Sequence, residues 1–176
     1  MKRIITGIFL VISFCINAQN EFTSLKLRHI EGIKALDFHY GKSDYGMFGS
    51  IGYTYYYSDK YFISPLLNYE QGKKGLTNFQ NYNIQINSHH TVLKLGDALF
   101  FNLKYGGQAG LEKCQGFENI KEQIKYTYGL NAGIQIEWYL INRIALLGLA
   151  EQQYNFNSNL GSLHYRYGLG LRFTIN

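Results

Sequence analysis

Residues 163–175 read LHYRYGLGLRFTI, and this stretch decides the fold. Successive side chains of a strand point to opposite faces, so an apolar residue at every second position predicts a strand with one apolar and one polar face. The strand is longer than the usual five or six residues, roughly, of a globular sheet. The apolar face holds Leu163, Tyr165, Tyr167, Leu169, Leu171, Phe173 and Ile175. The polar face holds His164, Arg166, Gly168, Gly170, Arg172 and Thr174.

The same period of two recurs upstream, most clearly over residues 126–140. Weaker alternation marks further segments, with a hairpin expected around residues 58–60 and a tight turn near Asn142. Residues 144–150 are apolar on both faces, which leaves their orientation open. Polar connections are expected at 72–78, 112–125 and 155–161. The predicted strands are 33–40, 47–57, 61–69, 82–87, 99–106, 126–140, 143–154 and 163–175.

Composition agrees with an all-β protein. The 176 residues include 16 Tyr, 12 Phe and 19 Gly but a single Pro, and only 16% are charged, against about 25% in an ordinary soluble domain. Aromatic and β-branched residues suit strands, whereas proline interrupts a strand ladder. These numbers exclude a disordered chain, a coiled coil and a disulfide scaffold.

The first 18 residues resemble a secretory signal peptide. Lys2 and Arg3 give a positive start, an apolar run follows over 4–16, and Ala18 precedes the expected cleavage site. A lipoprotein reading through Cys15 is the weaker alternative, since bulky Phe14 stands where a small residue is expected. Residues 19–176 then form one domain, because no linker divides them.

Cleavage would also change the charge and the cysteine content. The formal charge falls by two, from +5 to +3, which by itself does not predict nucleic-acid binding. The one remaining cysteine is Cys114, which we expect to be a buried or loop thiol.

Two observations favour lipid around the apolar face. An eight-stranded barrel is just wide enough for its side chains, so the inward face needs small residues, and Gly129, Gly133, Gly168 and Gly170 lie on the polar face. The longest predicted strands also match the roughly 9–11 residues of a tilted membrane strand. We therefore predict an eight-stranded antiparallel up-and-down transmembrane β-barrel in a Gram-negative outer membrane. A soluble lipocalin-like binder with its apolar face inward is the alternative.

Charged residues on the polar faces would then lie inside the barrel, where they need partners. We expect Glu137 to pair with Arg166 and Arg172, with Lys104 and Gln135 nearby, as a structural network. Aromatic residues gather at the membrane interfaces of such barrels. The expected interface residues are Trp138, Tyr165, Tyr167 and Phe173.

No catalytic constellation is predicted, and we expect a protein that is not an enzyme and holds no metal or cofactor. Ser162 and His164 share a face but lie about 6.6 Å apart along a strand, beyond the reach of a nucleophile and its base. The adjacent His89 and His90 point to opposite faces of a strand and are expected at a loop or rim. The glycine-rich residues 106–110 continue a strand and open no helix, unlike a phosphate-binding loop.

The C-terminal part resembles a known family. Residues 137–147 read EWYLINRIALL and residues 161–176 read GSLHYRYGLGLRFTIN. They are similar to the end of the conjugative transposon protein TraO family, where Glu-x-Tyr-Leu-x-x-Arg precedes a terminal Phe-Gly-x-Gly-x-Lys-Phe-x-Ile-Asn strand. Tyr167 replaces the Phe of that strand and Arg172 replaces the Lys. Residues 31–33 and 47–57 are also similar.

The resemblance implies a component of the DNA-transfer apparatus of conjugative elements, located in the Gram-negative envelope. Its partners would be other conjugal transfer envelope proteins and membrane lipid, with no direct nucleic-acid binding. The family gives no catalytic residue to carry over. An unrelated surface barrel of the OmpA/OmpX type, acting in adhesion or lipid modification, is the alternative function.

Overall fold

The computed structural model describes residues 28–115 and 123–175. The predicted signal peptide, residues 1–18, lies outside the described residues. No helix among the described residues is long and apolar enough to cross a membrane.

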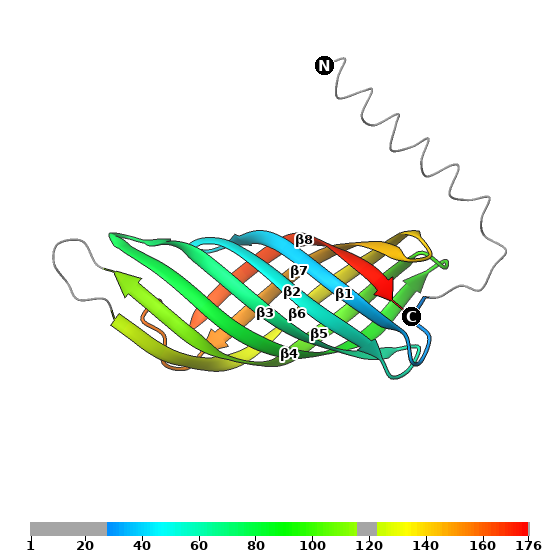
Figure 1. Ribbon diagram of the computed structural model, residues 1–176, viewed down its shortest axis with the longest axis horizontal. Coiled ribbons are helices and arrows are strands. Elements are labelled where there is room, and N and C mark those ends of the chain that lie inside the picture. Colours follow the sequence, from blue (N-terminus) through cyan, green and yellow to red (C-terminus); the bar gives the residue numbers. More distant parts are fainter. Residues whose placement is uncertain (1–27, 116–122, 176) are drawn as a thin grey trace, which may run out of the picture.

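Eight antiparallel strands form one closed barrel, in which each strand pairs with its neighbours in sequence and β1 pairs with β8 (Figure 1). This confirms the predicted fold class and the predicted number of strands. The strands are β1 Lys34–Ser43, β2 Gly46–Tyr56, β3 Tyr61–Lys74, β4 Thr77–Leu95, β5 Leu99–Gln115, β6 Gln123–Ile141, β7 Ile144–Asn155 and β8 Leu163–Ile175.

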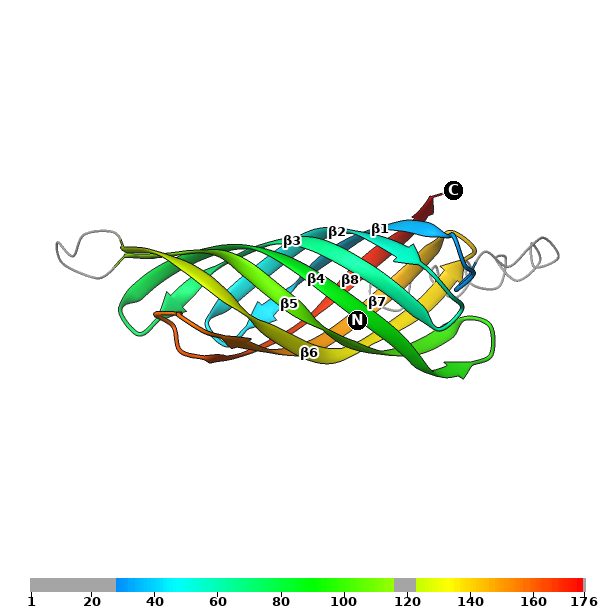
Figure 2. The ribbon, with the colours of Figure 1, turned by 90° about the horizontal axis from the view of Figure 1, so that it is seen from below.

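The barrel has two distinct ends, seen from a second side in Figure 2. At the terminus end, β1 begins and β8 ends, and turns 57–60, 96–98 and 142–143 connect the other strands. At the opposite end, here the loop end, the described connections are 44–45, 75–76 and 156–162. The expected hairpin around 58–60 is present, where the hydroxyl of Ser58 accepts hydrogen bonds from the backbone N–H groups of Lys60 and Tyr61.

Several strands extend further than the sequence predicts. The expected connection 72–78 is strand except for a turn at 75–76, and the ends of the expected connection 112–125 belong to β5 and β6. The prediction was wrong there because it followed apolar alternation, whereas backbone pairing continues after the outward side chains become polar. His89 and His90 likewise lie within β4 and not in a loop, with their side chains on opposite faces as expected.

The polarity of the barrel is inside-out. Outward residues such as Leu169 and Tyr126 are 64% and 78% exposed, whereas inward Arg172 is fully buried. This arrangement contradicts the lipocalin-like alternative, which needs an apolar lumen. It also settles the orientation of β7, in which Ala145, Leu147 and Leu149 face inward.

Inward glycines permit close approach of neighbouring strands. A Cβ atom added at Gly133 would lie 2.3 Å from the carbonyl oxygen of Ala150, and one at Gly168 would lie 2.6 Å from that of Tyr40. Outward Gly148 has no atom nearer than 3.9 Å to such a Cβ. The glycines on the inward face are therefore needed for the tightly curved wall as well as for the filling of the lumen.

Candidate functional site

The first charged group in the lumen centres on Arg172 of β8. Its Nε and Nη2 atoms donate to the two carboxylate oxygens of Asp37, each at 2.7 Å, and Nη1 donates to Oε1 of Glu137 at 2.6 Å. The hydroxyl groups of Thr54 and Tyr56 accept further hydrogen bonds from the same guanidinium. Asp37 and Arg172 are direct partners in the β1–β8 register. We call these five residues the Arg172 cluster.

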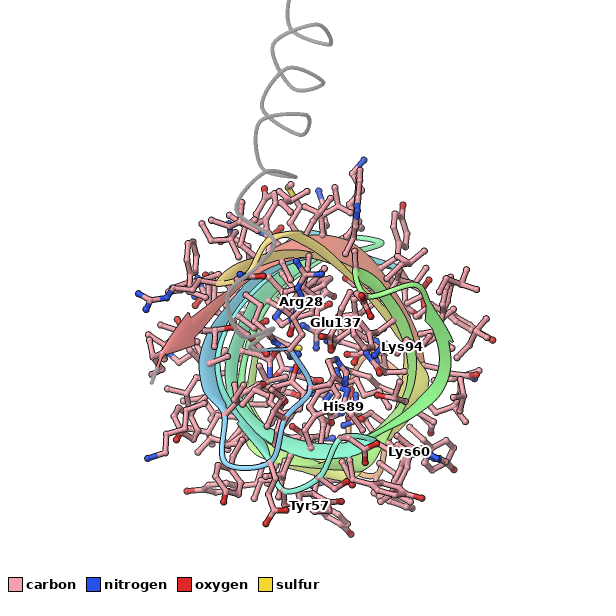
Figure 3. All side chains as sticks on the ribbon, turned by 90° about the vertical axis from the view of Figure 1, so that its right-hand side faces the viewer. Arg28, Tyr57, Lys60, His89, Lys94 and Glu137 are labelled. Carbon is pink, nitrogen blue, oxygen red and sulfur yellow. The ribbon has the colours of Figure 1, made fainter. Side chains whose placement is uncertain are left out.

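The segment before β1 closes the terminus end above this cluster. The His29 ring is buried and stacks on Phe100 with centroids 3.9 Å apart, and its Nε2 lies 2.9 Å from Oε2 of Glu137. Arg28 donates to a carbonyl of the β4–β5 turn and to Oδ1 of Asn142 in the β6–β7 turn. Viewed from this end, Arg28 lies across the mouth and Glu137 lies inside the ring of strands (Figure 3).

The second charged group centres on Glu151 of β7. Its Oε2 accepts a hydrogen bond from Nζ of Lys104, and its Oε1 lies 3.4 Å from Nη1 of Arg166. Arg166 also donates through Nη2 to Oδ1 of Asn68 at 3.2 Å and lies 3.9 Å above the ring of Phe48. We call Glu151, Lys104, Arg166 and Asn68 the Glu151 cluster. Its three charged side chains are at least 95% buried.

The β7–β8 loop folds over the loop end of the lumen. Leu160 of this loop is buried against Phe79 and Cys114. The carboxylate of Glu112 accepts hydrogen bonds from the hydroxyl of Ser158 at 2.6 Å and from a backbone N–H of the same loop at 2.8 Å. Cys114 is a free, buried thiol. Side chains thus fill both ends as well as the charged middle.

The expected interior residues are all buried in the lumen, but they divide between the two clusters. Arg172 contacts Glu137, whereas Arg166 contacts Glu151, which the sequence reasoning missed together with Asp37. The inward position of Asp37 was predictable from the sequence, because Asp37 alternates with the apolar Leu36 and Phe38. The inward position of Glu151 was not predictable, since the sequence left the orientation of its strand open. The four expected residues are Lys104, Glu137, Arg166 and Arg172.

The four expected interface aromatics all point outward. Trp138 and Phe173 lie toward the terminus end of β6 and β8, and Tyr165 and Tyr167 lie toward the loop end of β8. Their side chains are between 36% and 60% exposed. Their location at a membrane interface stays a prediction.

The polar residues considered for catalysis or metal binding are Ser162, His164, His89 and His90, and the structure shows the surroundings of each. The His164 ring is buried and its Nε2 bonds to the carbonyl oxygen of Gly161, while Ser162 is exposed. The His89 ring stacks on Phe62 inside the barrel, and the His90 ring stacks on Tyr61 outside it. Residues 28–115 and 123–175 contain no group of three His, Cys, Asp or Glu side chains suited to a metal ion.

These features define a small eight-stranded barrel with an apolar wall and a plugged, charged lumen, and solved structures share the fold. The N-terminal β-barrel domain of Pseudomonas aeruginosa OprF is similar with a TM-score of 0.65 and 11% identity, over 82% of this chain and 98% of that chain. Neisserial surface protein A is similar with a TM-score of 0.61 and 12% identity, over 81% of this chain and 96% of that chain. Ail, the attachment invasion locus protein of Yersinia pestis, is similar with a TM-score of 0.58 and 12% identity, over 83% of this chain and 100% of that chain.

The particular resemblance lies in the C-terminal part of the chain. Residues 114–175 match the family model described as conjugative transposon protein TraO, which confirms the predicted resemblance over that stretch. A search of curated proteins found no match. The matched stretch runs from the end of β5 through β8 and includes Glu137, Glu151, Arg166 and Arg172.

Proposed function

We propose that the chain is an outer-membrane β-barrel of a Gram-negative bacterium, exported through its N-terminal segment. The inside-out polarity supports this location, because outward Leu169 and Tyr126 are well exposed while the charged Arg172 and Glu137 are buried in the lumen. Burying the outward face in lipid removes this apolar surface from water. The likeness to outer-membrane barrels of known structure is consistent with the proposal.

Cell fractionation tests the location. We expect the protein in the outer-membrane fraction, with a gel mobility in detergent that changes on heating as the barrel unfolds. Recovery from the soluble periplasm, with the same mobility before and after heating, contradicts the proposal.

The proposed role is a non-catalytic envelope component of a conjugative transposon transfer apparatus. The observation that carries it is the TraO match over residues 114–175. The protein would anchor or contact other envelope proteins of the apparatus, without itself binding DNA.

The filled lumen supports anchoring over conduction. Arg172 and Glu137 are fully buried inside the barrel, and His29 and Leu160 close its two ends. An eight-stranded barrel encloses only enough space for its own side chains. No DNA strand fits through such an interior.

Gene deletion tests the role. We expect deletion in the donor to reduce the number of transconjugants, and a plasmid copy of the wild-type gene to restore it. A matched control is complementation with the conservative outward variant Leu169→Ile, which should restore transfer equally. Undiminished transfer after deletion removes the conjugation role and favours a surface barrel of the OmpA/OmpX type, with adhesive or lipid-modifying activity.

A further inference from the structure

The outer wall changes polarity abruptly between two neighbouring rows of side chains near the loop end. The strand register aligns Tyr69, Tyr82, Leu111 and Tyr126 in one outward row across β3 to β6. The next row toward the loop end has Gln71, Gln80 and Lys113 on β3 to β5 and the apolar Ile124 on β6. Two residues along a strand span about 6.6 Å, so on β3 to β5 the outer wall changes from apolar to polar between two adjacent rows of side chains.

Two grooves lie on either side of this boundary. The apolar groove has a volume of about 950 Å³, and the small outward residues Gly49 and Ala109 line it together with bulkier neighbours. The polar groove has a volume of about 510 Å³ and lies directly beyond it on the same strands. The other outward lining residues of the apolar groove are Ile51, Leu67, Tyr69, Tyr82, Ile84, Leu111, Tyr126 and Tyr128. Those of the polar groove are Met47, Gln71, Asn78, Gln80, Lys113 and Gln115.

The two grooves are direct neighbours on the outer wall. Gln71 of the polar groove accepts a hydrogen bond at 2.9 Å from the hydroxyl of Tyr69, which lines the apolar groove. The Tyr69 ring in turn packs against the Tyr82 ring with centroids 4.9 Å apart. A ligand that filled both grooves would therefore meet amides and a lysine at one end and hydrocarbon at the other.

The side chains of the polar groove indicate the chemical class of its ligand. Side-chain amides both donate and accept hydrogen bonds, which matches the hydroxyl groups of a sugar, and lysine is a point charge suited to phosphate. Lys113 lines the groove, and Lys73 is the register partner of its Asn78.

We propose that the two grooves form one site for a phosphorylated glycolipid, with its sugar phosphate in the polar groove and an acyl chain in the apolar groove. The site rests on the proposed membrane location, since it needs the lipid leaflet around the loop end. Lipid tails are as apolar as the groove, so a chain seated there is held by the fit of its shape and not by removal of apolar surface from water. The headgroup contacts of Lys113 and the amides therefore carry most of the selectivity.

Native mass spectrometry of the full-length folded barrel in detergent tests the site, with diphosphorylated lipid A as the probe. We expect one retained lipid A per barrel. Lys113→Glu should weaken its binding at least about tenfold, or about 1.4 kcal/mol. Lys34→Glu, the same change on an exposed outward residue at the terminus end, is the matched control and should leave binding unchanged.

The apolar groove is tested separately by Ala109→Trp, which fills it. We expect this variant to retain less lipid A than the wild type. Ala132→Trp, an outward alanine that lines neither groove, should bind normally. Each variant must keep its heat-dependent gel shift, which shows that the barrel has folded.

Three results overturn the site. In the first, Lys113→Glu binds diphosphorylated lipid A as tightly as the wild type does. In the second, the wild type binds lipid A without its two phosphates as tightly as diphosphorylated lipid A. In the third, Ala109→Trp retains as much lipid A as the wild type. A barrel that inserts into the outer membrane but retains no lipid A refutes the site alone. A protein recovered from the soluble periplasm refutes the membrane location first.

Discussion

The two charged clusters in the lumen differ in how completely their arginines are satisfied. All three guanidinium nitrogens of Arg172 donate hydrogen bonds to protein acceptors. In Arg166, Nη2 alone donates, while Nε and Nη1 have no hydrogen-bond partner among the residues that the structure describes. Arg172 contacts two carboxylates, Asp37 and Glu137, whereas Arg166 contacts the carboxylate of Glu151, which also pairs with Lys104.

The difference follows from where each cluster lies. Arg172 and Asp37 join β8 to β1, the pair of strands that closes the barrel, and Glu137 adds a contact to β6 across the lumen. A bidentate guanidinium–carboxylate pair fixes both distance and orientation. The Arg172 cluster therefore holds together the two strands at the ends of the barrel sequence, while the Glu151 cluster joins β3, β5, β7 and β8 across the lumen.

The largest effect is expected from Arg172→Gln. The substitution leaves Asp37 and Glu137 buried without their cation, and breaking a buried ion pair from one side costs about 3–5 kcal/mol. Unfolding by urea in lipid vesicles, followed through the fluorescence of Trp138, the single tryptophan, measures the loss. Lys34→Gln on the outer wall is the control and should change stability by less than about 0.5 kcal/mol.

A smaller loss is expected from Arg166→Gln, about 1–3 kcal/mol. Glu151 keeps its hydrogen bonds from Lys104 and Gln153 in this variant, so no carboxylate is left unpaired. The same urea titration measures it. If Arg166→Gln costs as much as Arg172→Gln, the two clusters are energetically equivalent and the comparison fails.

Much of the wall was predictable because the outward face is apolar wherever alternation was found. The prediction stopped short in β4 and β5, where outward residues such as Gln80 and Lys113 are polar although the strands remain paired. In β7 it gave no orientation, because Leu147 and Leu149 face the lumen from a strand whose outer face is also apolar.

The pairing inside the lumen was less predictable than the wall. Alternation indicates which residues face inward, but the partner of each charge depends on the register between paired strands, some of which are far apart in sequence. Arg172 and Asp37 are 135 residues apart and meet only because β8 closes onto β1. Arg166 meets Glu151 through the β7–β8 register, which sequence spacing alone did not reveal.

A third test removes one hydroxyl from the Arg172 cluster. In Thr54→Val the side chain keeps its shape, but Asp37 loses a hydrogen bond of 2.7 Å, Ser64 loses one of 2.6 Å and Arg172 loses an acceptor. We expect the free energy of unfolding to fall by about 1–2 kcal/mol, since removing one partner leaves buried polar groups unsatisfied. An unchanged urea midpoint contradicts the tight satisfaction assigned to this cluster.

The smallest effect is expected from Asn131→Leu, on the inward face of β6. Asn131 is 4% exposed, and both of its amide atoms lack a hydrogen-bond partner among the described residues. Replacing it with leucine, which has the same branched shape, removes a buried polar group without breaking a protein hydrogen bond, so stability should be nearly unchanged. A loss comparable to that of Thr54→Val would mean that polar groups outside the Arg172 cluster are held as firmly as those within it. The contrast between Thr54→Val and Asn131→Leu, both exchanges of a buried polar side chain for an apolar one, therefore separates the cluster from its surroundings without changing any charge.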